Sequence, residues 1–262
     1  MENIQFISDL HLDEPFCSEY FQSHPIDVMA KYLVIGGDLC DHDSLNNVQW
    51  FFDWCSLNYE QTYILYGNHD CFGITNLEQL LNGWNENIRS NVHYVNNSSI
   101  LINSTEIFFT TLWSELDIND KQYLLNKAVD FDKIKYNTST PLSFELYNHA
   151  HTICRNWLKE KIHNSKAQHK IVFSHHCPTT SLSPKKDSLF SLFRSNDEDL
   201  MKGVNLWVYG HTHFNTPPKW FEETLLVSNQ FGHFKEKDHT DWGPQQTTNS
   251  VYQKEFKSLY KE

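Results

Sequence analysis

The chain contains short runs of apolar and β-branched residues, and a polar or acidic cluster follows most of them directly. The clearest runs span residues 4–8, 31–35, 62–66, 171–174 and 206–209. Apolar runs of this length that end in turn residues are typical of buried strands. A further run at 225–228 is the last strand that the pattern predicts. The hydrophobic pattern therefore predicts an α/β protein built around β-sheets.

Apolar residues that recur every three or four positions predict three helices between these strands. The predicted helices span residues 43–59, 75–88 and 140–164. The second helix begins with the capping-box sequence Thr75-Asn76-Leu77-Glu78, and its apolar stripe reaches Ile88. For the third helix, Thr140 and Pro141 are typical starting residues. Strands and helices thus alternate along much of the chain.

The remaining segments are predicted to be loops and short strands. Residues 92–113 alternate apolar runs with Asn- and Ser-rich turns, which predicts three strands in a meander. Polar, pocket-lining loops are expected at 12–30, 114–140 and 179–199, with a short helix in the last. Lys185 and Lys186 there either meet a substrate phosphate or lie on a solvated face. Because no linker-like composition interrupts the chain, we expect a single domain over residues 1–262.

Composition narrows the class of protein. The 33 acidic and 21 basic residues give a net charge of −12, which makes a nucleic-acid partner unlikely because such proteins present a basic face. The six cysteines show no paired spacing and are expected to be free thiols of a reducing compartment. No signal peptide and no apolar run long enough to span a membrane is found, so we expect a soluble, cytoplasmic protein.

Five of the predicted strands end in side chains that bind metals or transfer protons. In chain order these are Asp9 and His11; Asp38; Asn68, His69 and Asp70; His175; and His211 and His213. Ligands of α/β sheets gather beyond the carboxyl ends of the strands, so we expect these side chains to converge. Two carboxylates, four imidazoles and an amide suffice for two divalent ions, with one carboxylate shared. Each cluster alone is a common surface turn, and their joint occurrence predicts the site.

These clusters resemble the five motif blocks of the calcineurin-like metallophosphoesterases: Asp9-x-His11, Gly37-Asp38, Gly67-Asn68-His69-Asp70, His175 and Gly210-His211-x-His213. Further segments are similar to the single-domain bacterial and phage branch of that family: Thr110-Thr111-Leu112-Trp113, Ser174-His175-His176-Cys177-Pro178 and Leu206-Trp207. The resemblance extends over about residues 4–213. Relatives in this branch often carry Asn-Pro-Arg-Gly after the last strand, whereas this chain has Asn229-Gln230-Phe231-Gly232. Since the arginine is missing, no substrate is inferred from that branch.

The resemblance implies a fold and a role for each residue. The fold is a four-layer αββα sandwich, in which two mixed β-sheets lie face to face and helices flank them. The first metal is expected to be held by Asp9, His11 and His213. The second metal is expected to be held by Asn68, His175 and His211. Asp38 would bridge the two ions, His69 would act on the leaving group, and Asp70 would orient His69.

These residue types fit metal-dependent hydrolysis of a phosphate ester. Two divalent ions lower the pKa of a shared water, and the resulting hydroxide attacks phosphorus in line with the leaving oxygen. A protonated His69 then delivers a proton to that oxygen as general acid. A mixed nitrogen–oxygen site accepts manganese, iron or zinc. The predicted substrate is a small phosphodiester or phosphomonoester.

Three other functions remain open at this stage. A Ser/Thr or Tyr protein phosphatase would use the same metal site on a larger substrate. A nuclease is disfavoured by the net charge of −12. A non-catalytic scaffold of the same fold would be expected to lose its general acid or a metal ligand. Because His69 and all seven predicted ligands are retained, we favour an enzyme.

Overall fold

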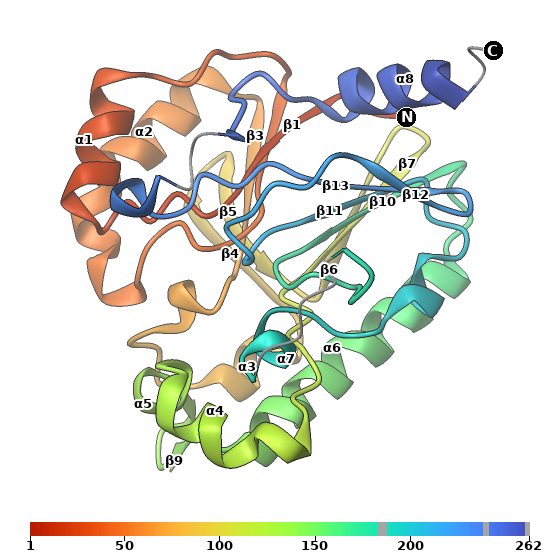
Figure 1. Cartoon of the computed structure of the whole chain (residues 1–262). Helices are drawn as coiled ribbons and strands as arrows, with labels where there is room; N and C mark the ends of the chain where they lie inside the picture. The colour runs from red at the N-terminus through yellow and green to blue at the C-terminus, as the bar shows by residue number, and fades with distance from the viewer. Residues whose placement is uncertain (183–187, 238–240, 260–262) are drawn as a thin grey trace.

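Two mixed β-sheets lie face to face, and helices cover their outer faces (Figure 1). The computed structural model describes residues 1–182, 188–237 and 241–259. Lys185 and Lys186, for which two roles were open, lie outside these ranges. The two-sheet, four-layer arrangement confirms the predicted fold class.

The first sheet is mostly parallel. Its strand order is β1 (Ile4–Ile7), β2 (Tyr32–Ile35), β3 (Gln61–Leu65), β5 (Val92–Asn96) and β4 (Trp84–Arg89). β1, β2, β3 and β5 are parallel neighbours, and only the edge strand β4 runs antiparallel. The carboxyl ends of β1, β2 and β3 therefore lie at one edge, where three of the five polar clusters follow them.

The second sheet repeats this design with four parallel strands and two antiparallel edges. Its order is β12 (Lys219–Phe221), β13 (Thr224–Ser228), β11 (Leu206–Tyr209), β10 (His169–Ser174), β7 (Thr105–Thr110) and β6 (Ser98–Ile102). The predicted meander over 92–113 is wrong in one respect. β5 belongs to the first sheet, whereas β6 and β7 form a hairpin in the second.

Side-chain alternation along the strands builds a core on both faces of each sheet. Between the sheets, one buried cluster includes Phe6, Val34, Leu65, Phe109, Phe173 and Val208. On the outer face of the second sheet, Phe108, Val172 and Trp207 pack with Leu158 and Ile162 of helix α6 (Phe144–Asn164). Burial on both faces explains why the strands read as continuous apolar runs rather than alternating ones.

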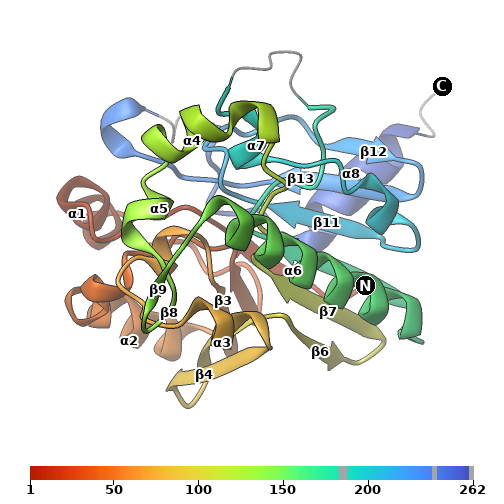
Figure 2. The ribbon, with the colours of Figure 1, turned by 90° about the horizontal axis from the view of Figure 1, so that it is seen from below.

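Helices cover the outer face of the first sheet as well. Helix α1 (Pro15–Ser23) and helix α2 (Gln49–Asn58) contribute Phe21, Phe51 and Phe52 to the core beneath it (Figures 1 and 2). The predicted irregular loop at 12–30 is therefore wrong over α1, because Pro15 starts a helix that buries Cys17 and Phe21. Within the described residues, the other α-helices are α3 (Leu77–Leu81), α4 (Lys121–Lys127), α5 (Asp130–Lys133), α7 (Phe190–Phe193) and α8 (Thr248–Leu259).

Three predicted helix boundaries differ from the structure. The helix expected over 43–59 starts with the 3-10 turns of His42–Val48 and becomes α-helical only at Gln49. The helix expected over 75–88 begins correctly, since the Asn76 side chain accepts a hydrogen bond from the Gln79 backbone at 3.1 Å. It ends at Leu81, and Gly83, with a φ of 99°, redirects the chain into strand β4, which pairs with β5. The helix expected at Thr140 begins at Phe144 with Ser143 as N-cap.

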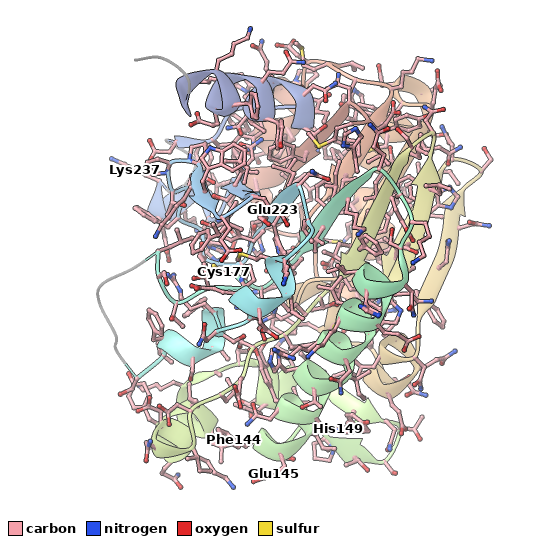
Figure 3. The ribbon with its side chains drawn as sticks, turned by 90° about the vertical axis from the view of Figure 1, so that its right-hand side faces the viewer. Phe144, Glu145, His149, Cys177, Glu223 and Lys237 are labelled. Atoms are coloured by element: carbon pink, nitrogen blue, oxygen red, sulfur yellow. The ribbon has the colours of Figure 1, made fainter. Side chains whose placement is uncertain are left out.

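Residues 114–143 form a small subdomain over one end of the sheets rather than an open loop. It contains α4, α5 and the hairpin of β8 (Lys135–Asn137) and β9 (Thr140–Pro141), which includes the misassigned helix start (Figure 2). Lys121 of α4 pairs with Glu145 and lies 5.3 Å from the ring centre of Phe144, so α4 docks on the first turn of α6 (Figure 3). Helix α5 of the same subdomain reaches the polar edge of the sheets, where Asp130 bonds to Asn68.

Candidate metal centre

The two sheets meet at their carboxyl ends, and the polar clusters converge there. Ser8, just after β1, forms a parallel bridge with Gln230, just after β13 of the other sheet. A left-handed backbone turns the side chains into the resulting space at Asp9, His11, Asp38, His211 and His213, with φ between 44° and 69°. Positive φ is uncommon outside glycine and clusters at functional sites. The strained turns thus mark the same residues as the motif pattern.

The first group of donors surrounds the end of β1. The ring nitrogens and carboxylate oxygens of Asp9, His11, Asp38 and His213 offer four atoms within 4.8 Å of one another. Nε2 of His11 lies 3.0 Å from Nε2 of His213, which is itself 3.4 Å from Oδ1 of Asp9. The backbone N–H of His211 donates to Asp9 at 2.9 Å and fixes that carboxylate. The predicted ligands of one ion are therefore assembled.

The second group lies beside it and shares Asp38. Donor atoms of Asp38, His175 and His211 lie within 4.8 Å of one another, and all three residues are buried. Oδ1 of Asn68 lies 3.1 Å from Nε2 of His175, which places the amide in the same group. The structure thus brings together all seven side chains that were predicted as ligands.

Unsatisfied polar atoms show that these residues fit cations. Oδ2 of Asp38 and Nε2 of His211 are buried and accept or donate no hydrogen bond. Nδ1 of His175 donates to the Gly36 carbonyl at 2.9 Å, so Nε2 is the nitrogen that offers a lone pair when the ring gives up its second proton to a cation. That lone pair faces two acceptors, Asn68 Oδ1 and Asp38 Oδ2, the latter at 3.3 Å. Converging lone pairs without protons between them are what a bound cation requires.

Asp38 lies between the two groups. Its Oδ2 is 3.9 Å from Nε2 of His11 on one side and 3.3 Å from Nε2 of His175 on the other. Close packing leaves no space behind it, since a Cβ at Gly67 would lie 2.1 Å from Asp38 Oδ1. Glycine is required at position 67 for this approach. The geometry suits a carboxylate that two cations share.

His69 lies at the open side of the first group. Its ring centre is 4.7 Å from that of His11, and its side chain is 25% exposed. Its backbone N–H donates to Asp38 Oδ1 at 2.9 Å, while Nδ1 lies 3.3 Å from Oδ1 of Asp41. Asp70 was expected beside this ring, but the carboxylate that contacts it is that of Asp41.

Asp70 instead organises the backbone beneath the ligands. Its Oδ2 accepts hydrogen bonds from the N–H groups of Asp38 (2.6 Å) and Gly67 (2.8 Å). Oδ1 accepts from the Leu39 N–H and the Tyr94 hydroxyl, each at 3.2 Å. Asp70 therefore ties the turn after β2 to the turn after β3. The adjacent position of His69 and Asp70 in the sequence suggested a contact, but their side chains point in different directions.

The carboxylates make the centre favourable for positive charge. Burial lowers the pKa of His69, but the charge of Asp38 and the hydrogen bond to Asp41 outweigh it, and the pKa rises to about 9. Burial also lowers the pKa of His175, but the Asp38 carboxylate outweighs this effect and raises the pKa to about 9. Burial and then neighbouring histidines lower the pKa of His11 and of His211. These two rings are neutral, the state in which imidazole binds metals.

Three residues at the centre escaped the sequence analysis. Asp130 of α5 is buried and accepts a hydrogen bond from Nδ2 of Asn68 at 2.8 Å, which turns the amide oxygen toward His175. Asp41 contacts His69 as described. His233 offers a third ring nitrogen within 4.8 Å of those of His11 and His213. None follows a predicted strand closely, and an acidic or histidine residue in a loop carries no local signal.

Two other residues of the motif segments belong to the core beside the centre. Trp113 is fully buried and packs against Tyr147 and His176. His176 contacts the Thr111 carbonyl and the Tyr147 hydroxyl, each at 3.1 Å, and its ring lies 4.1 Å from that of His211. It therefore supports a ligand without being one. All six cysteines are free and buried, as expected.

The comparisons with known proteins identify the family of the chain. The profile of the calcineurin-like phosphoesterase family matches residues 3–215, and the chain belongs to that family. It is therefore an ester-bond hydrolase of the metallophosphoesterase class. A comparison with curated proteins finds no match. No helix within the described residues is long and apolar enough to cross a membrane.

Among solved structures, the phosphopantetheinyl hydrolase from Mycobacterium tuberculosis superposes with a TM-score of 0.65 and 14% sequence identity. The match covers 92% of this chain and 93% of that one. A dimetal phosphatase from Danio rerio matches with a TM-score of 0.46 and 13% identity over 87% of each chain. At these identities the first likeness shows the fold alone, and the second is too weak to add to it.

Proposed function

We propose that the protein hydrolyses a small phosphodiester or phosphomonoester at a dinuclear metal centre. The observation that carries the proposal is the position of Asp38 Oδ2. This atom lies between Nε2 of His11 and Nε2 of His175, and it is buried and forms no hydrogen bond. Asp9, His11 and His213 would hold one ion. Asn68, His175 and His211 would hold the other, with Asp38 shared. Manganese, iron and zinc all suit this mixed nitrogen–oxygen set.

Two divalent ions at such a centre polarise phosphoryl oxygens and supply a nucleophile at neutral pH. The protein's own contribution is to hold the donors rigidly. Asp70 fixes the backbone of Asp38 and Gly67, and the N–H of His211 fixes Asp9. Asp130 holds the Asn68 amide with its oxygen toward the centre. Positioning of this kind is worth several kilocalories per mole in catalysis.

His69 is the group that we assign to the leaving oxygen. It is partly exposed, whereas the predicted ligands next to it are buried, so its ring can reach a bound ester. Asp41 lies at Nδ1, which leaves Nε2 as the nitrogen that donates the proton. A carboxylate behind the ring stabilises the imidazolium and fixes the orientation of the ring. His69 would thus act as general acid, with Asp41 rather than Asp70 as its partner.

The proposal also includes a cytoplasmic location. The six free and buried cysteines support a reducing compartment such as the cytoplasm, because disulfides are rare there. Within the described residues no cysteine is close enough to the centre to be grouped with its donors.

A substrate panel tests the proposed function. Protein supplied with Mn²⁺ is assayed on aryl diesters, aryl monoesters, cyclic nucleotides and dinucleoside polyphosphates. We expect hydrolysis of at least one class that disappears with a chelator and returns with Mn²⁺. The matched Asp38→Asn variant is expected to lose it. Hydrolysis that is unaffected by both the chelator and Asp38→Asn would contradict the proposal.

A further inference from the structure

His233 approaches the first group of donors from outside the family motifs. Its ring centre lies 4.5 Å from that of His11, nearly parallel to it, and 4.6 Å from that of His213. One of its ring nitrogens is within 4.8 Å of ring nitrogens of both residues. The three imidazoles thus form a cluster, of which two members are already predicted ligands of one ion.

The backbone places His233 at this point and fixes it there. Phe231 and Gly232 follow strand β13, and their N–H groups donate to the carbonyls of Ser8 (3.0 Å) and Asp9 (2.9 Å). Gly232 has a φ of 74°, a conformation that suits glycine, and it turns the next residue toward the site. Phe231 is fully buried and packs against Phe21, which anchors the segment in the core beside the site that the His233 ring faces.

A carboxylate orients the His233 ring. Nδ1 of His233 lies 2.7 Å from Oε1 of Glu14, the residue that precedes helix α1. Metal-binding histidines usually donate their second ring N–H to a carboxylate or carbonyl, which fixes the tautomer and raises the basicity of the other nitrogen. Glu14 stands in that relation to His233. This pairing is independent of the clustering of the three rings, and both observations indicate that His233 binds a metal ion.

We propose that His233 is an additional ligand of the ion held by Asp9, His11, Asp38 and His213, with Glu14 as its orienting partner. The inference rests on the dinuclear centre proposed above. With His233 included, three imidazoles and two carboxylates would hold this ion. Two imidazoles, an amide and the shared carboxylate would hold the other ion. Imidazole-rich sites bind borderline metals such as zinc more strongly than sites of oxygen donors. The two positions should therefore differ in affinity.

Two other roles for His233 lead to different measurements. A histidine that contacts the substrate phosphate would change KM and leave metal binding unchanged. If His233 only formed a surface ion pair with Glu14, its substitution would change neither KM nor metal binding, since such pairs contribute little even to stability. The side chains of His233 and Glu14 are 26% and 35% exposed, so their substitution should be tolerated by the fold.

The test is metal binding by the full chain, measured without substrate. Mn²⁺ is titrated into wild type, His233→Asn, Glu14→Ala and Glu14→Gln, and free Mn²⁺ is followed by electron paramagnetic resonance. His24→Asn and Glu19→Gln, exposed positions on and beside the same helix α1, are the matched controls. A parallel titration with Co²⁺ records the visible absorption band, which changes when a nitrogen ligand is lost.

We expect His233→Asn to weaken one of the two binding steps by about tenfold or more, a loss typical of changes near a metal. The other step should stay unchanged, and the Co²⁺ band should shift. Glu14→Ala should weaken the same step less, and Glu14→Gln less still, because the amide oxygen still accepts from Nδ1. The controls should match wild type. Equal melting temperatures in chelator would show that each variant is folded.

The possible failures are distinguishable. If wild type binds two ions and His233→Asn binds them with the same affinities and the same Co²⁺ band, the inference is wrong and the dinuclear centre stands. A higher KM with unchanged metal binding would assign His233 to the substrate instead. If wild type binds no ion, the proposed function fails, and the role of His233 fails with it.

Discussion

Asp41 Oδ1 lies 3.3 Å from Nδ1 of His69, and it is this carboxylate, not that of Asp70, that faces the proposed general acid. The two residues come from different strand-end loops, one after β2 and one after β3. A carboxylate at Nδ1 keeps the proton-bearing Nε2 directed toward the open side of the centre. The first two predictions concern His69 and these two carboxylates.

His69→Asn should keep both metals and lose activity according to the leaving group. A positioned general acid supplies about 10²–10⁴ in rate, and a basic leaving group depends on it most. We therefore expect kcat to fall by about that factor for alkyl or ribose leaving groups and by much less for nitrophenyl phosphate. Steady-state kinetics with both substrate types check this. Equal losses would mean that His69 stabilises charge on phosphorus instead.

Asp41→Asn should reproduce part of the His69→Asn pattern, whereas Asp70→Asn should not. Loss of the Asp41 carboxylate removes the partner of the ring but leaves every predicted ligand in place. Loss of the Asp70 carboxylate weakens hydrogen bonds that shape the Asp38 turn, so metal affinity and thermal stability should fall. Leaving-group dependence and metal content of both variants are to be compared with Asp132→Asn, an exposed control. A loss of metal in Asp41→Asn would contradict this division of roles.

Asp130→Ala should weaken the binding of one ion. The Asp130 carboxylate, on helix α5, holds the Asn68 amide at 2.8 Å, and outer partners of ligands typically contribute about 10–100-fold in affinity. Asp132→Ala on the same helix is the control. Calorimetric titration with Mn²⁺ gives both affinities. Unchanged binding in Asp130→Ala would show that Asn68 keeps its orientation without this partner.

Asp38→Asn and His213→Ala should differ in how much metal they lose. Asp38 is placed between both donor groups, whereas His213 belongs to the first group alone. Asp38→Asn is expected to lower both affinities, and His213→Ala to empty one position. If the two variants lose metal identically, Asp38 does not bridge.

The strands and most of the donors could be predicted because their signals are local. A buried apolar run followed by Asp, Asn or His within a few residues identifies both the strand and the direction in which the chain then turns. Asp9, Asp38 and His211 are of this kind. The two-sheet arrangement followed from the family resemblance rather than from periodicity, which does not tell which strands pair.

The remaining features depend on contacts between distant segments. Glu14 and His233 meet because the segment after β13 bonds to the turn after β1. Asp130 reaches Asn68 because the subdomain of residues 114–143 folds over the end of the sheets, 62 residues further along the chain. Trp84 and Ile88 fit a helical stripe, yet pairing with β5 draws them into a strand. In each case tertiary contacts decide the outcome, and the local sequence is compatible with more than one conformation.

Metal stoichiometry tests the central claim, a dinuclear centre that shares Asp38, most directly. The chain is purified without chelator, loaded with Mn²⁺, freed of excess metal and analysed by mass spectrometry of metal content alongside Asp38→Asn. We expect a value near two ions per chain for wild type and clearly fewer for the variant. A saturating value of one ion with full activity, unchanged by Asp38→Asn, would contradict it.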